Sequence, residues 1–244
     1  AAPTIGLGHL SRMLSLAHEL RKDEELKVDF LIFGEFIEKA ELEEYSVNYR
    51  GLEDDLITEI KATVESNRSD VVVFDLYPQA IPDNLGNLLG WLTDRGVGTV
   101  GVDSLIEYCD TVDLLWIPSF YFNKEAYNNC KATLRSGWDS FLLQKRLSNR
   151  EWAHGKNVLI LTGGCDIKNL NRTLPTHLDK LLVEDVSLHW VQGPFSSPPH
   201  LPKKQRLNWT THSAPSSLDE LIVQSNYVLT VFGVTFFEVL QYGV

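Results

Sequence analysis

The sequence predicts an α/β protein with two Rossmann-like lobes, and three observations lead to this fold class. Short β-branched runs alternate with amphipathic stretches along the 244 residues, which is typical of parallel strands joined by helical crossovers. Continuous apolar runs such as Val71-Val72-Val73-Phe74 suit strands that are buried on both faces. A chain of this length accommodates two domains of ordinary size.

The first lobe is expected to hold residues 1–148 and to begin with a helix. Apolar residues at helical spacing predict this helix: Leu10, Met13, Leu14, Ala17 and Leu20. Strands are then expected at 28–33, 71–74, 99–102 and 114–117, and further helices at 54–66 and 79–95.

The second lobe is expected to hold residues 149–244. The stretch 121–156 is polar, rich in aromatic residues and without a clear strand pattern, so the boundary is placed near 145–156. Strands are expected at 158–161, 186–191, 207–210 and 227–231, and helices at 168–182 and 217–224. Ser217, followed three residues later by Glu220, predicts a capping box at the last of these helices.

Charge and hydropathy disfavour two classes of partner. The formal net charge is −11 and there is no block of Lys and Arg, so the surface repels phosphate backbones and nucleic-acid binding is not expected. No apolar run approaches the roughly 20 residues of a membrane helix, and no cleavable leader is visible. We expect a cytoplasmic monomer. The chain lacks an initial Met and ends within a helical pattern, which indicates that a short start and a longer end are missing.

The chain offers no pattern typical of a metal or dinucleotide site, and neither a metal nor a cofactor is expected. Cys109, Cys130 and Cys165 are odd in number and far apart, so they are expected to be reduced thiols. Four histidines lack the spacing of metal ligands: His177, His189, His200 and His212. A Gly-x-Ser-x-Gly elbow and the third glycine of a dinucleotide fingerprint are both missing.

The first of three glycine-bearing turns is Ile5-Gly6-Leu7-Gly8-His9. Gly6 and Gly8 allow the backbone to approach a ligand at the start of the first helix. His9 stands at the positive end of the helix dipole, which favours a neutral imidazole that accepts a proton, although a histidine that only caps the helix is the alternative. Arg12, one turn later, is either a phosphate partner or a solvated helix position.

The second turn is Gly163-Gly164-Cys165-Asp166, and the third runs from Gly233 to Glu238. Asp166 suits the N-cap of the following helix, and the two glycines suit backbone contact with a nucleotide. In the third turn, Thr235 offers a hydroxyl to a phosphate. Glu238 offers two acceptor oxygens to a ribose, and its alternative is a surface glutamate.

Polar residues also follow two strands of the first lobe. Asp75 and Tyr77 follow the strand at 71–74, and Asp103 follows the strand at 99–102. The carboxyl ends of parallel strands share one sheet edge, where ligands bind in open α/β sheets. Each polar residue at that edge either meets a ligand or caps its own loop.

Together these motifs resemble those of the UDP-sugar hydrolases of pseudaminic acid biosynthesis and the related spore-coat polysaccharide proteins. The matching motifs are Ile5-Gly6-Leu7-Gly8-His9 with Arg12, Gly163-Gly164-x-Asp166 with Asn169, and Gly233-x-Thr235-x-x-Glu238. Both groups are similar to the two-lobed GT-B glycosyltransferases that use nucleotide-sugars, including the lipid-II-forming enzyme of peptidoglycan synthesis.

The resemblance implies metal-free hydrolysis of a UDP-sugar, bound in a cleft between the lobes, with release of UDP and free sugar for surface-glycan biosynthesis. His9 is implied to activate the attacking water and Tyr77 to line the sugar site, while the Gly233 to Glu238 turn holds the diphosphate and ribose. Two alternatives stay open. One is a GT-B glycosyltransferase with an acceptor alcohol or lipid, and the other is a binder of nucleotide-sugars without catalytic activity.

Overall fold

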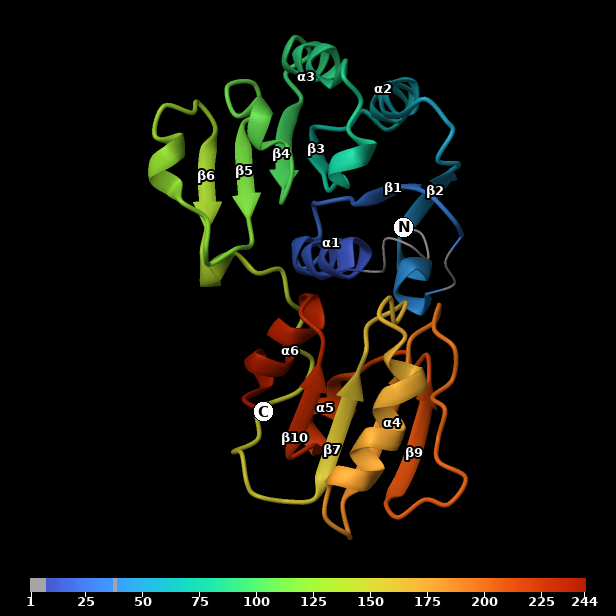
Figure 1. Ribbon diagram of the computed structural model, residues 1–244. Helices are drawn as coiled ribbons and strands as arrows, with labels where there is room; N and C mark the ends of the chain where they lie inside the picture. The colour runs from blue at the N-terminus through green and yellow to red at the C-terminus, as the bar shows by residue number, and fades with distance from the viewer. Residues whose placement is uncertain (1–7, 37–38) are drawn as a thin grey trace. The chain divides into compact units, whose positions relative to one another are not determined.

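The computed structural model describes residues 8–36 and 39–244, and these form two compact units (Figure 1). The first unit groups residues 143–244 with the segments 8–19 and 39–44, and the second comprises 20–36 and 45–142. With the expected boundary at 148/149, the first helix would belong to the N-terminal lobe, whereas here it groups with the C-terminal half. The residue at which the two lobes divide stays a prediction.

A parallel sheet in the order β3-β4-β5-β6 forms the centre of the second unit (Figure 1). Its strands are Val71–Phe74, Gly98–Val102, Leu114–Ile117 and Thr133–Ser136, and helices α2 (Leu56–Asn67) and α3 (Leu85–Thr93) contribute to the same core. Leu85, Leu88, Leu89 and Leu92 of α3 are completely buried there. A separate parallel pair, β1 (Asp29–Phe33) and β2 (Ser46–Arg50), completes the regular strands of this unit among the described residues.

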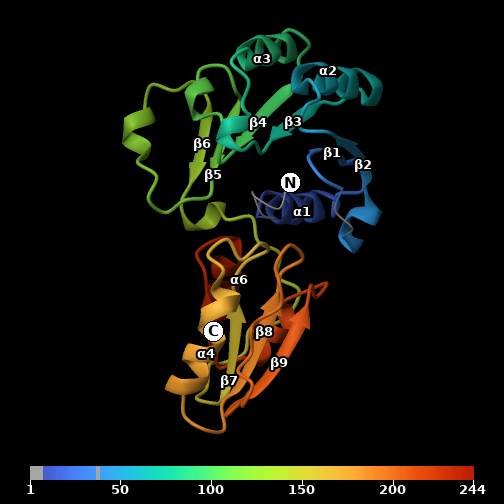
Figure 2. The same ribbon diagram turned by 45° about the vertical axis from the view of Figure 1, so that its right-hand side comes forward.

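The second sheet, in the first unit, has the order β10-β7-β8-β9, and all its pairs are parallel. Its strands are β7 (Asn157–Leu161), β8 (Ser187–Gln192), β9 (Asn208–Ser213) and β10 (Tyr227–Thr230), and its helices are α4 (Leu170–Leu181), α5 (Asp219–Gln224) and α6 (Val234–Tyr242). Alternate residues of each strand face opposite sides. Ile160 and Trp190 pack with α4, whereas Leu159 and Val191 pack with α5 and α6. Figure 2 shows β7, β8 and β9 side by side in this sheet.

Two further helical segments group with this sheet: α1 (Gly8–Leu20) and the short 3-10 helix η1 (Ala40–Glu44). Leu10, Leu14 and Ala17 form the buried stripe of α1, as their spacing predicted. Within the described residues, no helix combines the length and apolar character needed to cross a membrane.

Proline makes the main difference between the predicted and observed helices. The helix expected at 79–95 is shorter, because Pro78 begins a 3-10 turn at Pro78–Ala80 and α3 starts only at Leu85. Proline disfavours helical backbone in the residue before it and removes a backbone donor, so Pro82 separates this turn from the helix.

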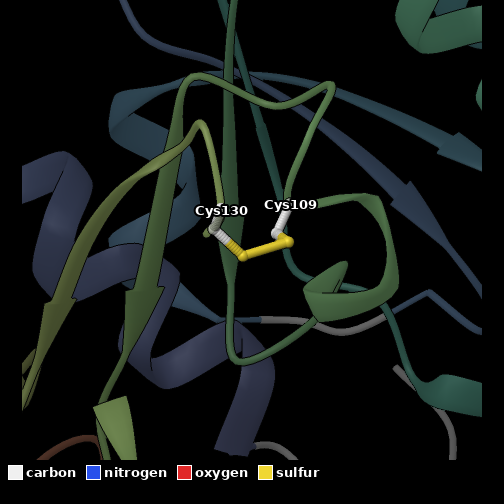
Figure 3. Close-up of a disulfide and its surroundings, with 2 residues drawn as sticks. All are labelled: Cys109 and Cys130. Carbon is white, nitrogen blue, oxygen red and sulfur yellow. A yellow bond between two sulfur atoms is a disulfide. The ribbon is translucent and has the colours of Figure 1, made fainter. Parts of the chain in front are cut away.

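The prediction of three reduced cysteines is wrong for two of them. Cys109 and Cys130 form a disulfide with a Cα–Cα distance of 5.3 Å (Figure 3), and Cys165 keeps a reduced thiol, as expected. Cys109 precedes β5 and Cys130 precedes β6, and these parallel neighbours start at the same sheet edge. The backbone N–H of Ala132 donates to the carbonyl of Cys109 at 2.9 Å, which brings the two chain segments together.

Candidate nucleotide pocket

A cavity of about 590 Å³ lies at the carboxyl edge of the second sheet, within the first unit. The turns that follow all four strands line it: 162–168 after β7, 193–194 after β8, 214–218 after β9 and 231–235 after β10. The order β10-β7-β8-β9 reverses direction between β7 and β10, which makes this position the topological switch point of the sheet. Open α/β sheets bind ligands at such points.

The third glycine turn places an uncapped helix N-terminus at this cavity. Gly233 is the N-cap of α6, and because glycine has no side chain it cannot cap the helix. The first turn of α6 contains no acidic residue. Gly233, Val234 and Thr235 all line the cavity. Among the described residues no side chain caps this helix start, and the positive end of the helix dipole favours an anion there; we call it the candidate anion site.

The start of α1 lies beside the start of α6. A Cβ added to Gly8, the first residue of α1, would lie 3.6 Å from Cγ2 of Val234. Gly8 also lines the cavity, and α1 likewise has no acidic residue in its first turn. Two helix N-termini therefore converge on one region, as the first and third motifs predicted for Gly8 and Gly233. Gly6 lies outside the described residues.

The second glycine turn has a different role, because the start of α4 is already capped. The buried carboxylate of Asp166 accepts hydrogen bonds from the backbone N–H groups of Leu170 at 2.9 Å and Asn171 at 2.8 Å. The carboxylate of Asp166 therefore caps the start of α4, as predicted, although Asp166 itself is not the N-cap residue. A bound carboxylate at this helix end excludes a phosphate from it. Asn169 takes the N-cap position of α4 with a φ of 53° and does not line the cavity.

Gly163 and Gly164 line the cavity wall. Their packing partner, Gly193, was not anticipated from the sequence. A Cβ on Gly193 would lie 2.4 Å from the carbonyl oxygen of Gly163 and 2.5 Å from that of Gly164. The backbone N–H of Phe195 also donates to the Gly164 carbonyl at 3.0 Å. Gly193 is therefore required for the turns after β7 and β8 to pack together.

Thr162, directly before this glycine pair, carries a buried hydroxyl. Its side chain is 5% exposed and lines the cavity, and its Oγ1 has no hydrogen-bond partner among the described residues. Buried polar atoms are nearly always hydrogen-bonded in folded proteins. The hydroxyl of Thr162 is therefore available to a ligand at the cavity wall.

Glu238 lies one turn into α6 and also lines the cavity. Its side chain is half-buried, so it is not the freely solvated surface glutamate of the alternative interpretation. Burial raises the pKa of Glu238, and the nearby carboxylate of Asp219 raises it further, while Lys39 and a hydrogen bond with Thr235 oppose the shift. Both Thr235 and Glu238 thus stand on the same helix end as the candidate anion site, as predicted.

Asp219 is the centre of a hydrogen-bonded cluster that sequence reasoning missed. The carboxylate accepts hydrogen bonds from Tyr242 Oη, Ser217 Oγ and Arg146 Nη1, the last at 3.1 Å. Burial would raise the pKa of Asp219, but these donors outweigh it and lower the pKa. Arg146 also donates to Glu41 at 3.1 Å, so the cluster connects the segment before β7, η1, α5 and α6.

The predicted capping box at Ser217 and Glu220 is wrong. Helix α5 begins at Asp219, and Ser217 Oγ accepts from the backbone N–H of Asp219 at 3.2 Å while it also contacts the Asp219 carboxylate. Glu220 is exposed. The reason is that Asp219 offers Ser217 a nearer partner, and its carboxylate is in turn held by Tyr242 and Arg146.

His9 and Arg12 contact each other on α1. An Arg12 guanidinium nitrogen donates to Nδ1 of His9 at 3.2 Å. Because a guanidinium only donates, Nδ1 is the acceptor and the ring proton of neutral His9 is on Nε2. Arg12 is 9% exposed, so the alternative of a solvated helix position is wrong. Neither residue lines the cavity, and their catalytic and phosphate-binding roles stay predictions.

The polar residues that follow β3 and β4 belong to the second unit. Tyr77 ends the segment after β3 as the N-cap of the turn at Pro78–Ala80 and is exposed. Asp103 follows β4 with a φ of 52°, and its backbone N–H donates to the Trp116 carbonyl at 2.9 Å. Asp75 and Asp103 lie at the same carboxyl edge of their sheet, as expected. The predicted sugar contact of Tyr77 stays a prediction.

The described residues contain no cluster of three or more His, Cys, Asp and Glu side chains suited to a metal ion. His189 and His212 form a pair, with 3.2 Å between Nδ1 of His189 and Nε2 of His212. Burial lowers the pKa of His189, and the proximity of His212 lowers it further.

Comparison with known proteins identifies the fold. No protein-family model and no curated protein sequence matches the chain. The structure is similar to the crystal structure of MurG from Acinetobacter baumannii, with a TM-score of 0.57, 13% sequence identity, and coverage of 95% of this chain and 72% of that chain. MurG is a GT-B glycosyltransferase, and at this identity the likeness shows the fold alone. The predicted GT-B-like architecture of two Rossmann-like units is confirmed, and the narrower resemblance to UDP-sugar hydrolases stays a prediction.

Proposed function

We propose that the chain is a nucleotide-sugar-dependent enzyme that binds a nucleoside diphosphate in the cavity of its first unit. The observation that supports this most directly is the uncapped N-terminus of α6 at the switch point of the sheet, with Glu238 one turn further along the helix. A helix start that lacks a capping side chain and acidic neighbours attracts an anion. A carboxylate one turn away suits the paired hydroxyls of a ribose.

In this proposal the diphosphate lies over the start of α6, where the backbone N–H groups donate to its oxygens. The hydroxyl of Thr235 donates to it as well, in place of its hydrogen bond to Glu238. The start of α1 adds a second helix dipole of the same sign, since Gly8 and Val234 are neighbours. Glu238 accepts from the ribose, and Thr162 supplies a further hydroxyl at the wall. These donors also stabilise the charge that develops on a departing diphosphate when the glycosidic bond breaks.

The acceptor of the sugar separates the two candidate reactions. Hydrolysis rests on the motif resemblance around His9, and transfer to an acceptor hydroxyl rests on the fold shared with a glycosyltransferase. In either reaction, a His9 that takes a proton must first exchange its Nδ1 contact with Arg12 or shift its ring proton from Nε2. UDP is the proposed nucleotide on the basis of the same resemblance.

Calorimetry with UDP tests the pocket. The wild-type chain is expected to bind, and Thr235→Val is expected to weaken binding about 10- to 150-fold, because a hydrogen bond to a charged group contributes about 1.5–3 kcal/mol. Thr211→Val, which alters an exposed threonine on β9, is the matched control and should bind as the wild type does. Equal affinities for all three proteins would show that α6 does not hold the diphosphate.

Turnover is then followed by NMR with a panel of UDP-linked amino sugars, with and without an acceptor alcohol. Free reducing sugar in the absence of an acceptor indicates a hydrolase, and a new glycoside indicates a transferase. His9→Ala should abolish either product while UDP affinity is kept. Binding of UDP without any product from any sugar would contradict the proposal of an enzyme and favour a binding protein.

A further inference from the structure

Four aromatic side chains gather at the carboxyl edge of the sheet β3-β4-β5-β6, and none of them is among the residues assigned above to the nucleotide pocket. Phe120 and Tyr121 follow β5, and Trp138 and Phe141 follow β6. We name this group the aromatic surface. Its members belong to the second unit, and the strands that they follow run parallel and adjacent, so their carboxyl ends meet at one edge (Figure 1).

The rings of the aromatic surface are ordered with respect to one another. Phe120 and Trp138 stack with 4.9 Å between ring centroids and an interplanar angle of 5°. Tyr121 lies 4.3 Å from Phe120, and Phe141 lies 5.8 Å from Trp138. Even with these contacts, Trp138 is 60% exposed and Tyr121 is 86% exposed. Exposed aromatic rings at this density mark interaction sites in soluble proteins.

The backbone beneath the aromatic surface is held at several points. The N–H of Gly137 donates to the carbonyl of Ser119 at 3.2 Å, which connects the two turns that carry the rings. The indole N–H of Trp116 in β5 donates to the carbonyl of Ser140 at 2.6 Å. Gly137 has a φ of 103°, a conformation that side chains other than glycine rarely adopt. The rings are therefore mounted on a fixed frame.

The disulfide adds to this frame from the opposite end of β5. Cys109 and Cys130 enclose the segment that contains β5, Phe120 and Tyr121 (Figure 3). A cross-link of this kind reduces the number of conformations open to the enclosed segment. Flat, exposed rings on a rigid support bind ligands at a low entropic cost.

We propose that the aromatic surface binds a neutral saccharide through stacking of a pyranose ring on Trp138 and Tyr121. A pyranose presents an apolar C–H face to an aromatic ring and hydroxyls around its edge, so it needs both a ring and polar neighbours. The exposed carboxylate of Asp139 and the phenol of Tyr121 supply these polar neighbours. The net charge of −11 repels an anionic lipid bilayer, whereas a neutral sugar carries no charge to be repelled.

Saturation-transfer NMR with methyl glycosides of glucose, galactose and N-acetylglucosamine tests the proposal on the full chain. At least one glycoside should bind, and Trp138→Ala should weaken its affinity at least tenfold without changing the affinity for UDP. Trp152→Ala, which removes an indole that is 46% exposed in the first unit, is the matched control and should bind like the wild type. Tyr121→Ala provides an independent second variant if Trp138→Ala fails to fold.

Three outcomes would overturn the proposal. The first is that the wild type binds none of the glycosides. The second and third are that Trp138→Ala, or Tyr121→Ala, binds a glycoside as tightly as the wild type does. Flotation with phosphatidylcholine–phosphatidylglycerol vesicles and sedimentation velocity distinguish the other occupants. Trp138-dependent vesicle binding or dimer formation, in place of glycoside binding, would assign the aromatic surface to a membrane or a second copy. Loss of UDP binding alone would overturn the nucleotide pocket and leave this inference standing.

Discussion

Replacement of Glu238 by glutamine separates the function of this residue from its effect on stability. The substitution keeps the size of the side chain and one acceptor oxygen, but it removes the charge and the second acceptor. A hydrogen bond to a charged group contributes about 1.5–3 kcal/mol, so the loss of one ribose contact should weaken UDP binding about 10- to 150-fold. The fold should be preserved, because Glu238 is half-buried at the cavity wall and is not part of the hydrophobic core of this unit.

Glu238→Gln is expected to weaken UDP binding, but it is not expected to lower the stability of the chain. The pKa of Glu238 is raised in the folded chain by burial and by Asp219, so the protonated form is favoured there more than in the unfolded chain. The resulting stabilisation is complete below the unfolded pKa and is lost as the pH rises through the folded pKa. At neutral pH the charged Glu238 therefore costs stability, and Glu238→Gln should unfold at the same temperature as the wild type or a higher one.

Calorimetry and thermal unfolding at several pH values test both parts. Wild-type affinity for UDP should fall as the pH drops through the raised pKa of Glu238, because protonation removes an acceptor, and Glu238→Gln should lose this dependence. The difference in affinity between wild type and Glu238→Gln should be smaller for UDP that lacks one ribose hydroxyl than for UDP itself. Glu220→Gln, on an exposed residue of α5, is the control. Equal affinity of Glu238→Gln and wild type for UDP would refute the ribose contact.

Three further substitutions follow from the same structure. Asp219→Asn should destabilise the chain by about 1.5–3 kcal/mol at neutral pH. Because the pKa of Asp219 is lowered in the folded chain, the difference in melting temperature from wild type should shrink as the pH falls through that pKa. A difference that does not change with pH would contradict this. Gly193→Ala should lower the free energy of unfolding by about 1–3 kcal/mol and weaken UDP binding, because the new Cβ meets the Gly163 carbonyl. The control Gly90→Ala has open space and should be neutral or stabilising in urea titrations. Equal effects of the two substitutions would refute the packing argument. Cys130→Ser should lower the free energy of unfolding by about 3 kcal/mol, as expected for a 21-residue separation, and a reducing agent should destabilise the wild type in urea while leaving the variant unchanged.

The sequence predicted the central strands well because their residues are buried on both faces. The runs 71–74 and 114–117 were predicted with the bounds that the structure has, and the β-branched and leucine-rich composition accounts for this. Strands β2 and β6 were missed. Both lie at sheet edges and carry polar residues such as Asn48 and Arg135, which interrupt the apolar pattern that a buried strand needs.

The candidate site was predictable only where local chemistry defines it. Gly233 and Asp166 could be found because turn glycines and N-cap carboxylates have sequence signatures. Gly193 and Asp219 could not, because their roles depend on partners brought together by folding: the Gly163 carbonyl in one case, and Tyr242 and Arg146 in the other. The disulfide was missed for the same reason, since its pairing depends on an edge strand that the pattern did not reveal.

The acidic character of the chain limits how a diphosphate can be held. Three cations of the described chain line the cavity: Arg146, Lys39 and Lys168. Arg146 is engaged by Asp219 and Glu41, and Nζ of Lys39 lies 3.5 Å from Oε1 of Glu41, so these two offer little uncompensated charge and, of the three, Lys168 alone adds to the helix start. Backbone N–H groups at a helix start need no counter-charge from the surface. Because Asp166 occupies the start of α4, the start of α6, with α1 beside it, is the end of a helix at this cavity best able to meet an anion.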